Sequence, residues 1–328
     1  MKNWTGSEFE GISACWGAIA FFSTVAIAAP TLAQTIVPDG SAGTIVSPDG
    51  DRVDIFGGSL SSDGSNLFHS FDEFGVETGR IANFITTPDI NNILSRVTGG
   101  DASYINGLIQ VSGGNSNLFL MNPAGIVFGQ NASLNVPADF TATTATGIGF
   151  GSGWLGLENE TNWSQLVGDP IAFNFSNPLG GVLVNEGVLS VPFGHQLGLL
   201  GGTIVNTGTL RSPGGNITIA AVPGENLVRL SAPGNLLNLE FLPTTNNTLT
   251  HLLTGGHIDS SHSNIIIHDD GTISIAGSGI RIDPQTGDAI VSGTVDVSNS
   301  SPPLPLPHSC HIGRSRCCCQ CQYRSIQC

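Results

Sequence analysis

The sequence predicts an all-β fold, a right-handed parallel β-helix in which a single chain winds through stacked coils, with an amino-terminal cap and further elements outside the coils. Three observations predict it. Short apolar segments recur along the chain without the period of a helix. Corners rich in glycine and asparagine separate these segments, and the chain contains 44 glycines. Apolar residues make up 40% of the sequence and charged residues only 11%, which suits a narrow stacked core better than disorder.

The clearest corner lies in the first half of the chain. Two apolar segments, 118–121 and 126–128, flank the four residues Asn-Pro-Ala-Gly at 122–125. Asparagine can cap a turn with its own side chain, proline fixes φ and lacks an N–H, and glycine accepts positive φ. We therefore expect a tight turn between two strands. A second corner at 129–132 leads into a third strand at 133–136.

Residues 147–178 interrupt the alternation of apolar and polar residues. Trp154, Trp163, Phe173 and Phe175 are interspersed there with glycine, asparagine and acidic residues. We expect an excursion or capping element that lies against the solenoid. Its aromatic side chains are expected to cover an open edge, because an uncapped stack of strands would pair with other chains.

A repeat becomes visible after residue 180. The segments VLVNEGVLSV and TIVNTGTLRS place Asn185 and Asn206, and then Gly187 and Gly208, 21 residues apart. One coil of a parallel β-helix needs about that much chain, and a single coil cannot bury its own inner face, so the coils must stack. Further coil strands are expected at 216–222, 227–232, 272–275, 279–282 and 294–297.

Several of these motifs, in order, resemble a known family. NPAGI at positions 122–126 is followed by VFG, by NASLNV and by an F-x-A-T-T-A run that begins at Phe140. This series is similar to the N-terminal secretion domain (haemagglutination activity domain) of two-partner secretion proteins of the filamentous-haemagglutinin type, as in large cyanobacterial surface proteins. The upstream segments NLFHSFDEF, NNILSRVTGG and INGLIQV agree with it. The resemblance is strong over 35–146 and weak over the later coils.

The resemblance implies a non-enzymatic exoprotein whose N-terminal domain directs export through a partner outer-membrane β-barrel transporter with periplasmic domains. It implies that this partner recognises Asn122, Pro123, Ala124, Gly125 and Ile126. It also implies adhesion at the cell surface to a host, cell-surface or polysaccharide ligand, and no cofactor and no metal.

From local physics alone the same corner is a plain β-turn, and the two interpretations are compatible. A second Asn-Pro motif of the haemagglutinin branch is missing, because Thr87-Pro88-Asp89 stands near the corresponding place. This departure puts partner contacts upstream of the corner in question.

The amino end has the three-part layout of a secretory signal peptide. Lys2 precedes an apolar run at 14–29, and Thr31-Leu32-Ala33 forms a small-residue site for cleavage between Ala33 and Gln34. The run is shorter than the ~20 residues that a spanning helix needs. We therefore expect a cleaved leader, no stable membrane span, and a secreted or cell-surface protein that passes through the periplasm and the outer membrane.

Cysteines are confined to the two ends of the chain. Of seven, Cys15 lies in the expected leader and the other six follow residue 309. An exported chain without disulfides in its body must rely on packing and backbone hydrogen bonds.

The tail from residue 301 carries proline, arginine and cysteine but no acidic residue. Cys318 and Cys321 with His308 and His311 would offer the ligands of a metal-binding knuckle. Three adjacent cysteines and the lack of a second cysteine pair at finger spacing favour an unstructured or out-of-frame end instead.

Four segments follow from these observations. They are the leader 1–33, a two-partner secretion domain at 34–178, further β-helix coils at 179–300 and the tail 301–328. The formal net charge of −15 repels phosphates, so nucleic acid is not an expected partner.

The alternative from another class is a β-helical polysaccharide lyase or hydrolase. The best candidate patch is His268-Asp269-Asp270, with His257, Asp259 and His262 nearby in sequence. Neighbouring acids can bind a cation or supply an acid/base pair. No lysine follows them and no arginine repeats at coil spacing beside them, which favours a solvated loop.

Overall fold

The computed structural model describes residues 35–157, 161–177, 180–222, 224–232, 234–243, 265–267, 273–275, 280–282, 288–298, 320–322 and 325–327. All of them belong to the compact unit Gln34–Cys328.

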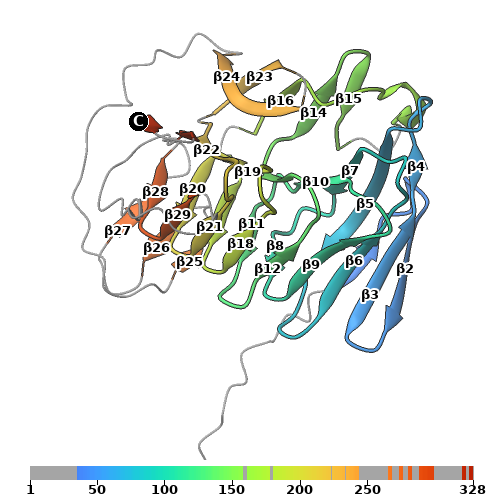
Figure 1. The fold of residues 1–328 in the computed structure, drawn as a ribbon, viewed down its shortest axis with the longest axis horizontal. Coiled ribbons are helices and arrows are strands. Elements are labelled where there is room, and N and C mark those ends of the chain that lie inside the picture. Colours follow the sequence, from blue (N-terminus) through green and yellow to red (C-terminus); the bar gives the residue numbers. More distant parts are fainter. Residues whose placement is uncertain are drawn as a thin grey trace, which may run out of the picture. The chain divides into compact units, whose positions relative to one another are not determined.

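Three parallel sheets form the wall of a β-helix (Figure 1), so the predicted fold is confirmed. Sheet A contains β5 (Asn66–Phe74), β7 (Asn92–Val97), β10 (Asn117–Met121), β13 (Phe140–Thr143), β19 (Gln196–Gly201) and β22 (Asn216–Ala221). Sheet B contains β3 (Arg52–Gly57), β6 (Ile81–Ile85), β9 (Leu108–Ser112), β12 (Ser133–Asn135), β18 (Val188–Ser190), β21 (Thr209–Arg211) and β29 (Thr294–Asp296). Sheet C contains β8 (Ser103–Ile105), β11 (Ile126–Phe128), β17 (Val182–Asn185), β20 (Thr203–Asn206) and β28 (Ala289–Val291).

Each coil passes from sheet A to sheet C and then to sheet B. Each coil therefore connects two parallel neighbouring strands of the same sheet. Connections of this kind are almost always right-handed. The three strands expected around the first two corners are present as β10, β11 and β12.

The predicted 21-residue coil is present in the later part of the chain. Asn185 and Asn206 are partners in register, and a hydrogen bond of 2.7 Å joins their side chains. Gly208 lies so close to the coil before it that an added Cβ would be 2.2 Å from the carbonyl oxygen of Gly187. The early coils are longer, because Asn66, Asn92 and Asn117 form a similar ladder at spacings of 26 and 25 residues.

Antiparallel strands cap the first coil, as predicted. β1 (Ile36–Pro38) and β4 (Ser59–Leu60) both pair with β5, and β2 (Thr44–Asp49) forms a hairpin with β3.

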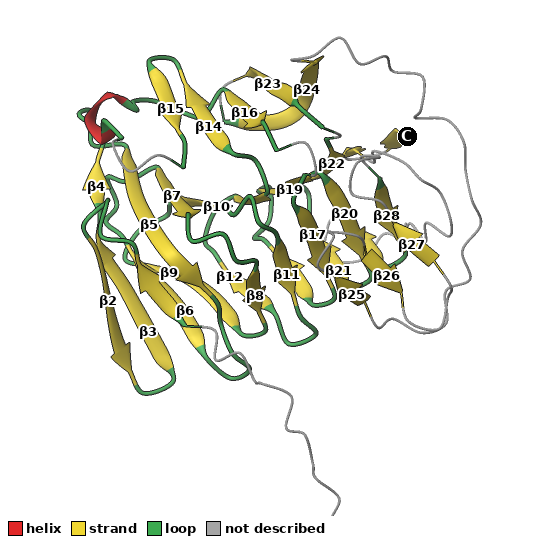
Figure 2. Ribbon diagram, turned by 180° about the vertical axis from the view of Figure 1, so that it is seen from behind, coloured by secondary structure: helices red, strands yellow, loops and turns green. Residues whose placement is uncertain are grey.

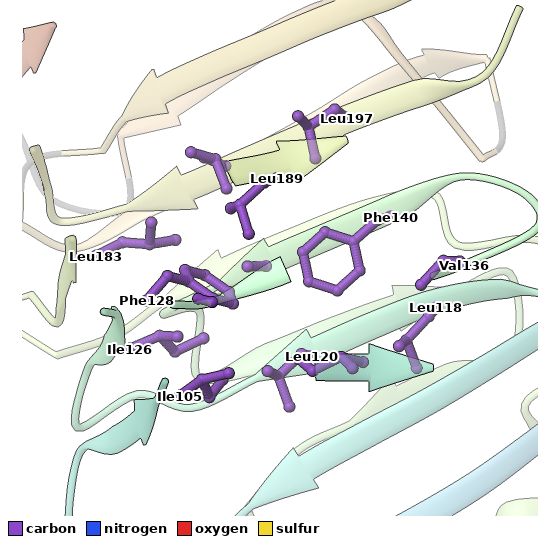
Figure 3. Close-up of a cluster of buried hydrophobic side chains, with 14 of the residues drawn as sticks. Ile105, Leu118, Leu120, Ile126, Phe128, Val136, Phe140, Leu183, Leu189 and Leu197 are labelled. Carbon is purple, nitrogen blue, oxygen red and sulfur yellow. The ribbon is translucent and has the colours of Figure 1, made fainter. Parts of the chain in front are cut away.

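The inner faces of the three sheets enclose one apolar core (Figure 3). Phe128 from sheet C and Phe140 from sheet A meet edge to face with 6.1 Å between ring centroids. Leu118 and Leu120 reach the same core from β10, and Leu189 reaches it from β18.

An antiparallel sheet, sheet D, lies outside the coils (Figure 2). It contains β14 (Gly147–Phe150), β15 (Gly153–Leu155), β16 (Ala172–Phe175), β23 (Asn226–Ala232) and β24 (Asn235–Pro243), with the short 3-10 helix η1 (Trp163–Gln165) between β15 and β16. Phe150, Phe173 and Phe175 from sheet D form a second core with Phe119 and Met121, which point outward from sheet A.

The expected excursion is therefore present, but one expectation about it is wrong. Trp163, Phe173 and Phe175 cover the outer face of sheet A rather than an open edge, whereas Trp154 is 46% exposed. Both segments that form sheet D leave the coils at the corner between sheets A and C, the first after β13 and the second after β22.

Two groups of expected coil strands are also corrected. The segment 227–232 is part of β23, which pairs antiparallel with β16 and β24. The segments 272–275 and 279–282 correspond to β26 (Ile273–Ile275) and β27 (Ile280–Ile282), which form an antiparallel sheet with β25 (Ile265–Ile267). Alternating apolar residues indicate a strand but not the direction of its partner, which is why these predictions failed. The segments 216–222 and 294–297 do contain coil strands, β22 and β29.

Within the tail, the described residues form β30 (Gln320–Gln322) and β31 (Ser325–Gln327). β30 pairs antiparallel with β22 and with β31.

Candidate functional site

The five residues from Asn122 to Ile126 form the corner that connects β10 in sheet A to β11 in sheet C. The turn closes with a hydrogen bond of 3.1 Å from the Gly125 N–H to the Asn122 carbonyl. The Ala124 N–H donates to the Asn122 side-chain oxygen at 3.0 Å. Gly125 has a φ of +130°, a conformation that favours glycine. The expected turn and its asparagine cap are both present.

The side chain of Asn122 also binds the preceding coil. Its Nδ2 donates to the carbonyl of Asp101 at 2.9 Å and to Oγ of Ser103 at 3.0 Å. Asn122 is 1% exposed, so these bonds satisfy a buried amide that would otherwise be costly. The Asn122 N–H in turn donates to the carbonyl of Thr143 in the following coil at 3.0 Å. This one residue therefore connects three successive coils.

Glycine allows the following coil to approach the corner closely. A Cβ added at Gly181 would lie 2.5 Å from the Pro123 carbonyl oxygen, and one at Gly125 would lie 3.1 Å from the Val182 carbonyl oxygen. The corner is thus packed between its neighbours on both sides.

Burial divides the five predicted residues into two groups. Asn122, Gly125 and Ile126 are buried, Pro123 is half-buried and Ala124 is exposed. Of these five residues, only Pro123 and Ala124 offer side-chain surface to a partner in the folded chain. No feature of the sequence distinguishes these two groups.

The residues that surround the corner were not predicted from the sequence. Tyr104 pairs with Val127 on adjacent strands of sheet C, is 42% exposed, and adds apolar surface next to the corner. Ser103 and Asp101 hold the Asn122 side chain, yet no local pattern identifies them, because the contact depends on the register between two coils.

A second polar centre lies on the outer face of sheet A around Arg96, which is 0% exposed. Its guanidinium donates to Ser41 in the cap, to Ser70 in β5, and to the Gly156 carbonyl and Thr161 Oγ1 in the loop after β15. The guanidinium also lies 4.8 Å from the ring centroid of Trp163. Arg96 thus joins the cap, the coils and the loop of sheet D.

Asp39 supplies the nearby negative charge. Burial raises the pKa of this carboxyl, but hydrogen bonds from Ser70, Ser41 and Thr98 outweigh burial and lower the pKa below its ordinary value. Burial lowers the pKa of Arg96, and the charge of Asp39 opposes that effect.

Other predicted sites lie outside the described residues. These are the cleavage site at Ala33 and Gln34, the acidic patch with its neighbouring histidines, and the side chains of the tail knuckle. In the described part of the chain, no three His, Cys, Asp or Glu side chains gather as a metal site would require. The helical structure described there includes nothing long and apolar enough to span a membrane.

A capped parallel β-helix with a tight Asn-Pro-Ala-Gly corner and an added antiparallel sheet defines a β-solenoid domain. The family model described as the TPS secretion domain matches residues 34–275. The chain belongs to this family, and hence to two-partner secretion, as the ordered motifs predicted.

Comparison with solved structures and with curated proteins gives two further findings. The crystal structure of the HMW1 secretion domain from Haemophilus influenzae is similar, with a TM-score of 0.41 and 19% sequence identity over 65% of this chain and 48% of that chain. The chain thus spans about half the length of this solved relative. No curated protein matches the chain.

Proposed function

We propose that this chain is the amino-terminal part of an exported surface protein, and that its corner at Asn122–Ile126 directs export through a partner outer-membrane β-barrel. The observation that supports the proposal is this tightly bonded corner within a region that matches the TPS secretion domain. The partner's periplasmic domains would bind residues 35–146, in part by pairing with exposed strand edges. Folding coil by coil outside the cell would then oppose back-sliding.

We further propose that the exported molecule acts in adhesion at the cell surface, with no catalytic residue and no cofactor. This part rests on the resemblance to the filamentous-haemagglutinin type. The acidic composition suits an exported chain, because a net charge far from zero favours solubility.

The export test uses two changes at the corner in cells that also produce a two-partner outer-membrane barrel. Asn122→Ala removes the buried amide, which both shapes the turn and binds the preceding coil. Ala124→Arg changes only exposed surface at the tip of the turn. We expect both changes to reduce the amount of chain in the medium by about tenfold, since a loss of about 1.4 kcal/mol in binding free energy is a factor of ten and important interface contacts cost more than about 1 kcal/mol.

The matched control is Gln130→Arg, which adds the same charge at the exposed second corner of the same coil. It is expected to leave export unchanged. Unfolding midpoints of the purified variants separate recognition from folding, because only Asn122→Ala should lower the midpoint. Equal export of the Ala124→Arg variant and the unaltered chain would remove the proposed surface role of the corner.

A double change of Asp269 and Asp270 to asparagine tests the enzyme alternative. Export is expected to be unaffected, because these residues have no part in the corner. Loss of polysaccharide cleavage in that variant, after cleavage by the unaltered chain, would instead establish the alternative.

A further inference from the structure

Sheet D carries an open groove of about 490 Å³ beside its edge strand β15. This volume lies within the range of small-molecule sites. We infer that the groove binds a neutral saccharide, with Trp154 as the platform on which a sugar ring stacks. This inference goes beyond export, because it concerns residues separate from the corner at Asn122–Ile126.

The indole of Trp154 is held in place by two glycines on the neighbouring strand. Gly149 is its cross-strand partner, and a Cβ added there would lie 2.8 Å from the indole ring. A Cβ added at Gly147, two residues earlier on the same face of β14, would lie 3.4 Å from the ring. Any larger residue at Gly149 would displace the ring, so the two glycines leave the space in which the indole packs against β14.

The other side of the indole is open. Trp154 is 46% exposed, although Ile148 and Leu155 on the opposite face of the same two strands are fully buried. An aromatic ring often packs over a glycine on a neighbouring strand, and this common pairing explains why one side of the indole is covered. It does not explain why the exposed ring also lines a groove.

Uncharged polar groups line the groove together with Trp154. The side-chain amides of Asn174 and Gln165 line the groove and make no hydrogen bond within the described part of the chain. The hydroxyls of Thr146 and Ser176, 2.8 Å apart, line it as well. These groups supply both donors and acceptors at the rim.

No charged side chain lines the groove among the described residues. Arg96 lies behind it and binds the Gly156 carbonyl and Thr161, but it is 0% exposed and offers no free surface charge. The net charge of −15 also repels anions.

A neutral sugar matches this set of groups. One face of a sugar ring presents C–H groups that pack on an aromatic ring, while its rim carries hydroxyls that exchange hydrogen bonds with amides. Acidic sugars would find a negatively charged protein and, among the described lining residues, no cation. Neutral hexose units are therefore the ligand class that fits.

The test is calorimetric titration of the purified full chain with neutral hexasaccharides of glucose and of mannose, and with a hexasaccharide of galacturonate. We expect at least one neutral hexasaccharide to bind. Trp154→Ala should weaken that binding at least about tenfold, because loss of an aromatic contact costs about 1.4 kcal/mol.

Two further variants guard against an effect on folding. Gln165→Ala changes an exposed residue and removes one amide from the rim, so it should weaken binding by a few-fold while the unfolding midpoint stays the same. Phe193→Ala removes another exposed aromatic ring, 62% exposed and outside the groove, and should bind as the unaltered chain does.

Three results would overturn the inference. They are no binding of any neutral hexasaccharide, equal binding by the Trp154→Ala variant, and tighter binding of galacturonate. Because binding is measured on purified chain, the result does not depend on whether the corner directs export.

Discussion

Sheets A and B are built from the same coils, but they bury different numbers of faces. In β10 of sheet A, all four residues from Leu118 to Met121 are buried. In β9 of sheet B, only Ile109 and Val111 are buried, and the residues between and beside them are partly exposed. The difference arises because sheet D covers the outer face of sheet A. A continuous apolar run therefore marks a sheet that is covered on both faces, whereas alternation marks one with a solvated face.

The largest expected effect tests the inner face of sheet A. Phe140 is fully buried there and packs against Phe128, so Phe140→Ala would leave a large cavity between sheets A and C. We expect a loss of about 3–5 kcal/mol in the free energy of unfolding, measured by urea titration. Asn135→Ala in β12 of sheet B changes an exposed residue and should cost less than about 0.5 kcal/mol.

A loss below about 1 kcal/mol for Phe140→Ala would contradict the description of one shared inner core. In that case the two faces of sheet A would contribute unequally, and the outer core under sheet D would be the main source of stability.

The second prediction concerns the outer face of sheet A. Arg96→Met keeps most of the side-chain volume but removes the bonds to Ser70, Ser41, Thr161 and the Gly156 carbonyl. Because Arg96 and Ser70 are fully buried and the other three groups are partly buried, we expect a loss of about 3 kcal/mol in the free energy of unfolding.

Hydrogen exchange should show where the loss occurs. Amides of η1 and the loop after β15 are expected to exchange faster, while those of sheet B stay protected. Arg52→Met is the control, since Arg52 is 43% exposed at its side chain and its ion pairs with Asp49 and Asp54 contribute little. If the amide exchange rates changed equally in sheets A and B, Arg96 would not act through the outer face of sheet A.

The sequence predicted the coils better than the added sheet, for a physical reason. A corner such as Asn-Pro-Ala-Gly at 122–125 is a local event, set by the φ preferences and side-chain capping of a few residues. The 21-residue spacing of Asn185 and Asn206 is likewise visible in one chain. The direction of strand pairing is not local, so the alternation at 227–232 predicts a coil strand where β23 in fact belongs to sheet D.

The candidate site shows the same limit. The turn at Asn122 and its bond to Ala124 follow from residue type, whereas the bonds to Asp101 and Ser103 depend on how the preceding coil is registered. No sequence pattern identifies Arg96 as the centre of a polar cluster, because its partners are distributed over the cap, β5 and the loop after β15. One sequence feature does indicate the cover over sheet A: the four residues at 118–121 are all apolar and lack alternation, as is typical of a strand buried on both faces.

The smallest expected effect at neutral pH concerns a polar residue on the inner face of sheet A. His69 is fully buried in β5 beside Phe71 and Phe84, and its Nε2 has no hydrogen-bond partner among the described atoms. Its Nδ1 lies 3.3 Å from Thr44 Oγ1 in the cap. Burial lowers the pKa of His69 to about 4.

The sign of the pH effect follows from this pKa. Above pH 6.5 the imidazole is neutral in both the folded and the unfolded chain, so His69 adds no pH dependence. Between pH 6.5 and 4 the unfolded chain takes up a proton that the folded chain does not, and stability falls. At pH 5 the expected loss is about 2 kcal/mol relative to pH 7.5, measured by urea titration.

His69→Phe removes the titrating group and keeps an aromatic ring of similar size in the core. The difference in the free energy of unfolding between this variant and the unaltered chain should therefore change by about 2 kcal/mol between pH 7.5 and pH 5, because all other titrating groups cancel. If that difference were independent of pH, the imidazole would be protonated within the core or exposed to water. The inner face of sheet A would then not be a water-free core at β5.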